Sequence, residues 1–271
     1  MRSTTSSPSV AQLFGAFALV ALGTALVMVT DLLVPDITQT GLQQNAVRLS
    51  IVAVILYGAW RALTRAQFSG RARLTAWVVI AVPLLVWQSI VWWLALGPVP
   101  LLPLGIAPPL LIGVPILLRS NTIARMLDAT PPSWLVGLQA YRVFGSVFLT
   151  GWLAGSLPAM SAVPAGAGDT LVGLLALPVA VLLRSQARGA RSAAVAWNVL
   201  GILDFVNAFT LTALTSPGPL PYPLVLIPAF GVPLSLLLHS LSLRQLRRLA
   251  SRDTTGLPVP TDQLAPRPAL N

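Results

Sequence analysis

Ionisable side chains lie inside two of the most apolar stretches of this chain, where such side chains are rare and usually functional. Arg142 lies in the stretch 134–156 and Asp204 in the stretch 192–214. Read as helices that start from the same side of a membrane, these stretches place the two residues at depths that differ by roughly 6 Å, because each helical residue rises about 1.5 Å. An arginine side chain covers that distance. The sequence therefore predicts a buried ion pair between Arg142 and Asp204.

Uncharged polar side chains accompany this pair. Gln139 precedes Arg142 by one helical turn, and Asn198 and Asn207 lie on either side of Asp204 in the second stretch. Side chains three or four positions apart share one face of a helix. We therefore predict a polar, ligand-binding pocket within the membrane, with the structural joining of helices as the alternative role of the same residues. The predicted lining residues are Gln139, Arg142, Asn198, Asp204 and Asn207.

The composition excludes several kinds of chemistry. The chain has no cysteine, no lysine and no glutamate, and its single histidine is His239. Thiolate catalysis, cysteine-ligated metals and bis-histidine haem are therefore ruled out within one chain. We predict no catalytic residue, no metal and no cofactor. His239 is interpreted as a polar residue at the membrane rim.

A further hypothesis rests on Gly166, Gly168 and Asp169, which spell G-x-G-D. This tetrapeptide resembles the motif of intramembrane aspartyl proteases and prepilin peptidases, which need a second membrane aspartate. The resemblance implies an intramembrane enzyme that uses Asp169 and Asp204. The local sequence favours a simpler role, because residues 158–168 are rich in Pro, Ala and Gly and predict a loop. Asp169 would then cap the N-terminus of a helix over 169–184.

The elements that carry these residues are expected to be membrane spans. Hydrophobic residues make up 55% of the 271 residues and charged residues 9%, a balance that is typical of a polytopic membrane protein. We predict an all-α helical bundle, because about eight stretches are long enough to cross about 30 Å of hydrocarbon as helices or nearly so. They are 11–33, 47–63, 74–96, 101–118, 134–156, 169–184, 192–214 and 222–243.

The arginines predict the orientation of this bundle. The net charge is +10, and in an eight-helix arrangement the arginines fall on one side, except Arg48 at the opposite face and Arg142 within a span. By the positive-inside rule, both termini are expected in the cytoplasm, with the protein in the bacterial inner membrane. Membrane lipids are the expected partners and nucleic acid is not. A small-molecule ligand, a second copy of the chain and another membrane protein stay open as further partners.

Two helical hairpins in the second half of the chain have similar sequences. Residues 140–145 match 196–201, and residues 178–185 match 233–240. Such self-similarity predicts repeated units. We predict hairpins in the same orientation at about 74–120, 134–185 and 192–240, within a transmembrane domain that spans residues 11–250. A cytoplasmic lead at 1–10 and a mobile tail at 251–271 complete the expected organisation.

The segments Q-A-Y-R, P-A-G-A-G-D, W-N-V-L-G-I-L-D and V-P-L-S-L-L-L-H-S fall within residues 134–250. Over this range the chain resembles a group of uncharacterised bacterial integral-membrane proteins, and the resemblance implies no activity. The leading hypothesis from the sequence is a small permease or ligand-binding membrane protein. The alternative is a non-catalytic membrane scaffold or assembly factor, and an enzyme that uses Asp169 and Asp204 is third.

Overall fold

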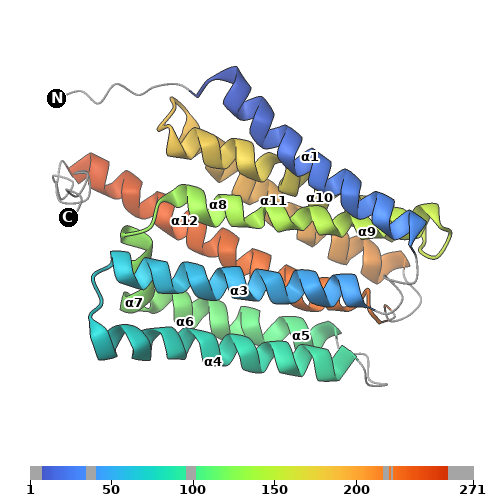
Figure 1. Ribbon diagram of the computed structural model, residues 1–271, viewed down its shortest axis with the longest axis horizontal. Coiled ribbons are helices and arrows are strands. Elements are labelled where there is room, and N and C mark those ends of the chain that lie inside the picture. Colours follow the sequence, from blue (N-terminus) through green and yellow to red (C-terminus); the bar gives the residue numbers. More distant parts are fainter. Residues whose placement is uncertain (1–7, 35–40, 96–101, 216–219, 221, 256–271) are drawn as a thin grey trace, which may run out of the picture.

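The computed structural model describes residues 8–34, 41–95, 102–215, 220 and 222–255. Within these ranges the chain forms helices and no strands (Figure 1). The prediction of an all-α protein is therefore confirmed. Residues 1–7 of the expected lead and 256–271 of the expected tail lie outside the described residues.

Six helices of the described chain are long and apolar enough to cross a membrane. The sixth, Ile227–Ser251, combines the π-helix η3 (Ile227–Gly231) with most of α12 (Val232–Thr255). A bent pair, Gly105–Arg119 with Asn121–Asp128, would make a seventh. These helices support a multi-pass membrane protein, while the number eight stays a prediction. The other five spans are α1 (Val10–Leu33), α3 (Leu42–Arg65), α4 (Gly70–Ala95), α10 (Ala159–Arg184) and α11 (Ala190–Thr215).

Two irregular segments lie alongside these long helices (Figure 1). The first consists of α5 (Leu102–Pro108), the π-helix η1 (Pro109–Gly113) and α6 (Val114–Arg119), followed by the short α7 (Asn121–Asp128). The second consists of α8 (Pro132–Leu138), the 3-10 helix η2 (Gln139–Ser146) and α9 (Val147–Leu153). The sequence predicted a membrane-spanning helix over 134–156, and the structure adds the tighter turn of η2 within it.

Proline accounts for the break in the first irregular segment. Pro109 has no backbone N–H, so the carbonyl of Gly105 one turn earlier loses its usual helical partner. The indole Nε1 of Trp87 donates to this carbonyl oxygen at 3.0 Å. The chain passes into the π-helix η1 at Pro109, and a side chain of α4 satisfies the freed backbone group.

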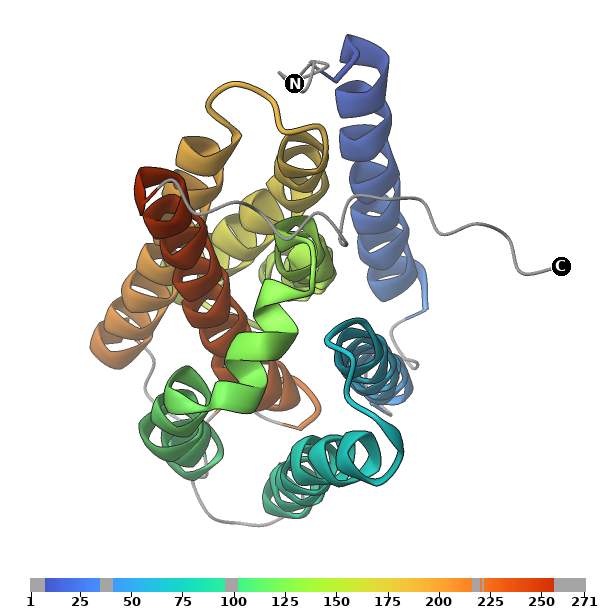
Figure 2. The same cartoon turned by 90° about the vertical axis from the view of Figure 1, so that its left-hand side faces the viewer.

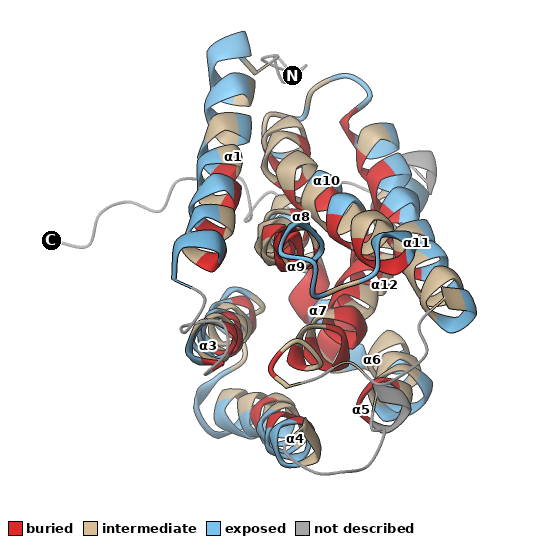
Figure 3. Cartoon of the chain, turned by 90° about the vertical axis from the view of Figure 1, so that its right-hand side faces the viewer, coloured by how far each residue is buried: buried red, intermediate tan, exposed pale blue. Residues whose placement is uncertain are grey.

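The interior of the bundle is organised around α10 and α12. Helix α10 packs against α1, α8, η2, α9 and α11. Seen end-on, α8 and α12 lie between the other helices and α1 lies at the edge (Figure 2). Buried residues concentrate on the inward faces, whereas much of α1 and α4 is exposed (Figure 3). Large apolar side chains such as Phe14 and Trp93 are among the exposed ones, as expected for surfaces that face lipid.

The loop predicted at 158–168 is helical, so the interpretation of Asp169 as an N-cap was wrong. Helix α10 begins ten residues earlier, at Ala159, with Pro158 as its N-cap residue. Small residues predicted a loop, but here they permit close helix packing. A Cβ at Gly166 would lie 2.8 Å from Leu149 Cγ, and one at Gly173 would lie 2.7 Å from the Val143 backbone nitrogen.

The boundary of the predicted tail also moves, because α12 continues to Thr255 rather than ending before residue 251. Its C-terminal half is anchored by contacts with the segment that follows α6. The amide of Gln245 donates to the carbonyl oxygens of Leu127 and Thr130 at 2.5 and 2.6 Å, and Arg248 pairs with Asp128 at 2.6 Å. The predicted repetition of the hairpins stays a prediction.

Basic side chains gather at one end of the bundle. Arg65, at the end of α3, stacks over Trp134 at 4.4 Å, and Arg73, at the start of α4, stacks over Trp60 at 4.6 Å. The first turn of α1 and the last turns of α12 lie at this same end (Figure 1). Cationic and aromatic side chains together are typical of a membrane interface.

The bond between Trp87 and Gly105 can be tested with Trp87→Phe. Loss of the indole N–H leaves a proline-freed carbonyl without its partner, which costs about 1–3 kcal/mol. We expect a lower melting temperature for the detergent-purified protein. Trp93→Phe is the control, because the Trp93 side chain is exposed. Equal melting temperatures for the two variants would contradict the assignment.

Candidate functional site

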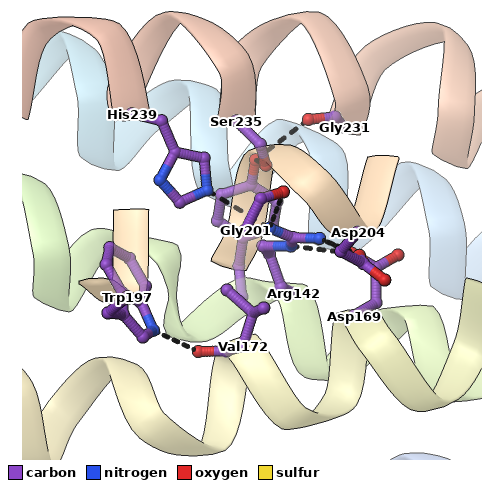
Figure 4. A network of polar contacts seen from close by, with 10 residues as sticks. Arg142, Asp169, Val172, Trp197, Gly201, Asp204, Gly231, Ser235 and His239 are labelled. Carbon is purple, nitrogen blue, oxygen red and sulfur yellow. Dashed lines mark hydrogen bonds and ion pairs between the residues drawn. The ribbon is translucent and has the colours of Figure 1, made fainter. Parts of the chain in front are cut away.

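Arg142 lies at the centre of a buried polar cluster between η2, α10, α11 and α12 (Figure 4). Its Nε donates to Asp169 Oδ1 at 2.7 Å, and its Nη2 lies 2.7 Å from that same oxygen and 2.6 Å from Asp204 Oδ2. Its Nη1 donates to the carbonyl oxygen of Gly201 at 3.3 Å and contacts His239 Nε2 at 3.2 Å. A guanidinium has five N–H donors. Four of them make hydrogen bonds here, and the Nη2 contact with Asp169 is an ion-pair contact.

The partners of His239 determine its protonation. Because arginine can only donate, His239 Nε2 must accept the hydrogen bond from Arg142. His239 Nδ1 lies 2.9 Å from Asn198 Oδ1, which is an acceptor, so Nδ1 must carry the proton. The amide nitrogen of Asn198 in turn donates to the Ala194 carbonyl oxygen at 2.7 Å and to Ser242 Oγ at 3.1 Å. The imidazole is therefore neutral. Along the chain of hydrogen bonds from Arg142 through His239 and Asn198 to Ser242, each residue donates to the next one.

Glycines make room for the charged side chains. A Cβ at Gly168 would overlap Asp204 Oδ1, and a Cβ at Gly145 would overlap Asp169. A Cβ at Gly201 would overlap His239 Nε2 and lie 3.0 Å from Arg142 Nη1. Glycine allows such close approach because it has no side chain. The three helices η2, α10 and α11 can therefore meet around one guanidinium.

The two carboxylates form part of the wall of a cavity of about 130 Å³. One oxygen of each, Asp169 Oδ2 and Asp204 Oδ1, has no hydrogen-bond partner among the described residues. The cavity is close in size to an engineered apolar cavity that accepts benzene. Its walls are mainly apolar and aromatic, with rings from Tyr141, Phe144, Phe148, Phe205 and Phe209.

The charges of the cluster do not balance. Arg142 contributes one positive charge, Asp169 and Asp204 contribute two negative charges when ionised, and His239 is neutral. Arg142 also lies 4.0 Å above the ring of Phe205, a cation–π contact. The ionised cluster therefore carries one excess negative charge in a mainly apolar environment. Such a charge is costly unless a proton or a cation compensates it.

The structure brings together some of the predicted site residues and separates others. The ion pair between Arg142 and Asp204 is confirmed, and both residues line the cavity. Asn198 contacts His239 behind the guanidinium and does not line the cavity. Gln139 is fully buried, and neither of its amide atoms has a hydrogen-bond partner within the described chain. Asn207 was wrongly placed in the pocket, because it lies on the exposed side of α11.

Sequence reasoning missed the roles of Asp169 and His239. Asp169 was assigned to a helix start because ten helical residues before it were read as a loop. His239 was assigned to the rim, but none of it is exposed and its ring packs 5.1 Å from Trp197. The sequence did contain a pattern that indicates the role of His239. Ser235, His239 and Ser242 follow one another at helical spacing and form a polar, buried face of α12.

The arrangement of the aspartates argues against the chemistry of an aspartyl protease. That chemistry requires two adjacent carboxylates that share one proton. Here the Arg142 guanidinium binds both carboxylates and forms an ion triad instead. Across the described residues, no group of three or more His, Cys, Asp or Glu side chains is placed to hold a metal ion.

Comparisons with known proteins identify one family. A model described as a domain of unknown function (DUF8737) matches residues 99–247, more than half of the chain. No curated protein and no solved structure matches the chain. The matched range includes Arg142, Asp169, Asp204 and His239, so the whole cluster lies inside the family domain.

The close approach at Gly201 can be tested with Gly201→Ala. The added methyl group would displace His239 from Arg142, and crowding of a packed interior typically costs about 1–3 kcal/mol. We expect a lower melting temperature in detergent. Gly58→Ala in α3 is the matched control, because a Cβ there meets no atom within 4 Å. If the two variants have the same melting temperature, the close approach at Gly201 is wrong.

The coupling within the cluster can be measured by a double-mutant cycle. Arg142→Gln leaves two buried carboxylates without their cation and is expected to lower the free energy of unfolding by about 3–5 kcal/mol. Adding Asp204→Asn should cost much less than its separate effect, because the charge it removes is already unpaired. The surface pair Arg248 and Asp128 is the control, with an expected coupling of about 1 kcal/mol or less. Additive effects at Arg142 and Asp204 would contradict a coupled site.

Proposed function

Because the chain belongs to the DUF8737 family, a domain of unknown function, we propose its function from the geometry of the site: it binds a small organic cation in the cavity beside Arg142. In this proposal it is a small permease or a ligand-binding membrane protein. The observation that carries the proposal is the pair of carboxylate oxygens, Asp169 Oδ2 and Asp204 Oδ1, that line the cavity without a hydrogen-bond partner among the described residues.

The charge balance supports a cation over an anion. The guanidinium of Arg142 is already occupied within the cluster by four hydrogen bonds and by ion pairs with two carboxylates. The carboxylates retain acceptor oxygens and, when both are ionised, one excess negative charge. A cation entering the cavity would gain an electrostatic partner and would remove the cost of the excess charge. An anion would gain neither.

The aromatic walls support an organic cation over a metal ion. The faces of aromatic rings attract cations, and cages of aromatic rings are a common way to bind alkylated ammonium groups. Five aromatic side chains line the cavity. A metal ion would need several oxygen ligands, and of the polar side chains lining the cavity only the two aspartates carry a negative charge. An alkylammonium group fits both the acidic and the apolar part.

For the membrane arrangement, we propose that the two irregular segments complete a set of eight spans. At about 1.5 Å per residue, Leu102–Arg119 and Pro132–Leu153 have lengths close to the hydrocarbon thickness. The arginine-rich end would face the cytoplasm of a bacterial cell, with both termini on that side. The cluster would then lie within the membrane between the hairpins at 134–185 and 192–240.

Two other functions are distinguishable from this one. A membrane scaffold or assembly factor would use the cluster only to join helices, which the four hydrogen bonds of Arg142 to three other helices favour. It predicts coupling in the double-mutant cycle without ligand binding. An enzyme that uses Asp169 and Asp204 would need the two carboxylates free of Arg142, which is not the arrangement observed.

Calorimetric titration with tetramethylammonium chloride tests the proposed function. We expect saturable binding to the purified protein and at least a tenfold loss of affinity for Asp204→Asn, since the ligand loses a charge partner worth about 1.4 kcal/mol or more. Asp128→Asn is the matched control, because Asp128 pairs with Arg248 away from the cavity. Sodium chloride and uncharged tert-butanol are the ligand controls.

The absence of saturable binding by the wild-type protein would refute the organic-cation site. Binding that survives Asp204→Asn unchanged would refute its location. Uptake of labelled tetramethylammonium into proteoliposomes then separates a permease from a binding protein.

A further inference from the structure

The two aspartates beside Arg142 share one cation. Arg142 Nη2 lies 2.7 Å from Asp169 Oδ1 and 2.6 Å from Asp204 Oδ2, so the two carboxylates meet at a single nitrogen. The Asp204 side chain is only 8% exposed, and its Oδ1 has no hydrogen-bond partner among the described residues. One positive charge therefore has to compensate two carboxylates in a mainly apolar site, and a buried carboxylate without full compensation is costly.

The other titratable groups at the site do not supply the missing charge. His239, which faces the cluster from α12, is neutral, because its Nε2 accepts from Arg142 and its Nδ1 carries the proton. Tyr141, from η2, lines the cavity, and its hydroxyl is bonded to the Gly231 carbonyl oxygen and to Ser235. Neither side chain is a cation in this arrangement.

The surrounding elements contain no second cation within reach. Helices α1, α8, α9 and η3 have no lysine, arginine or histidine, and the one carboxylate of α1, Asp31, accepts from Thr150 and does not line the cavity. Of the internal segments outside the described residues, 35–40, 96–101, 216–219 and 221, none contains a basic residue. Across the described residues, Arg142 is the one cation within ion-pair distance of either aspartate.

Two arrangements would leave the cluster without net charge. In the first, the pair of aspartates binds one proton, and the remaining ionised carboxylate balances Arg142. In the second, both carboxylates are ionised, and an organic cation in the cavity balances the second one. A proton and a cation therefore remove the same excess charge, and each makes the other unnecessary.

Binding of a proton leaves the contacts with Arg142 in place. Asp169 Oδ2 and Asp204 Oδ1 are the oxygens without a partner among the described residues, and a protonated carboxyl group still accepts through its other oxygen. The hydrogen bonds from Arg142 to Asp169 Oδ1 and Asp204 Oδ2 are thus compatible with both arrangements. Exchange of the proton for a cation does not require any of these bonds to break.

The cavity gives both ligands the same route to the aspartates. Its lining extends to Pro158, just before α10, and to Thr212, in the last turn of α11, at the end of the bundle opposite the basic side chains (Figure 1). On the other side of Arg142, Trp197 and His239 are buried (Figure 4). A water molecule needs about 10–15 Å³ on this kind of measure, so a cavity of about 130 Å³ has room for the water that takes up a released proton.

We propose that the site exchanges its organic cation for a proton: the pair of aspartates binds one proton in the ligand-free protein and releases it when the cation enters. The step balances, because one proton leaves into the cavity water for each cation that binds and the net charge of the site is unchanged. The proton belongs to the pair, since coupled carboxylates titrate together. This inference rests on the proposed cation site and adds a second ligand to it, and in a permease it couples cation movement to protons.

Calorimetric titration with tetramethylammonium chloride counts the released protons when it is repeated in phosphate and in Tris, because the ionisation enthalpies of these buffers differ. Toward acidic pH we expect release to approach one proton per cation, and affinity to rise about tenfold per pH unit while the pair stays protonated. Asp31→Asn is the matched control, since it removes a buried carboxyl group outside the cavity and should keep the release.

The outcomes of this titration separate the two proposals. Saturable binding without proton release, at an affinity independent of pH, would overturn the exchange and leave the cation site in place. The absence of binding at every pH would overturn both.

Infrared spectroscopy tests whether the pair holds the proton. A protonated carboxyl group has a carbonyl stretching band that an ionised one lacks, and tetramethylammonium should remove such a band from the wild type. Ligand-free Asp204→Asn and Asp169→Asn should each lack this band, because Arg142 fully compensates the one remaining carboxylate. Its persistence in either variant would show that a single carboxyl group holds the proton whatever the charge balance, and would overturn the shared site.

Discussion

The interaction on which the second half of the bundle depends is the binding of one guanidinium by three helices. Arg142 donates to α10 through Asp169, to α11 through Asp204 and the Gly201 carbonyl, and to α12 through His239. In an apolar medium an unpaired donor is costly, so the positions of these helices are determined together. Moving one of them leaves part of the charge without a partner.

This constraint explains the small residues nearby. Charged side chains can meet inside a bundle only if the backbones approach closely, and Gly145, Gly168 and Gly201 permit this on η2, α10 and α11. The same closeness leaves a space on the far side of the carboxylates, where their second oxygens lie. Packing and the cavity therefore have one origin, because both follow from how the charge is buried.

The fold class was predictable from the sequence, and so were two of the four charged or titratable residues in the cluster. Arg142 and Asp204 were predictable because a charged residue in an apolar stretch needs a partner, and helical rise limits which partner is in reach. Asp169 was not, because Ala, Gly and Pro have the same composition in a loop and in a tightly packed membrane helix. His239 was missed because a single histidine has no spacing of its own. Its role depends on Asn198, which lies 41 positions away and is brought beside it by folding.

The wall between the two cavities is formed in part by Tyr141, Phe144, Ile227 and Gly231, and these residues line both spaces. At these positions a single layer of residues separates the two cavities. Its polar atoms are held by the Tyr141 hydroxyl, which donates to the Gly231 carbonyl oxygen at 3.2 Å and lies 2.6 Å from Ser235 Oγ. The Tyr141 side chain therefore belongs to both cavity walls, and two hydrogen bonds to the α12 side of the bundle set its position.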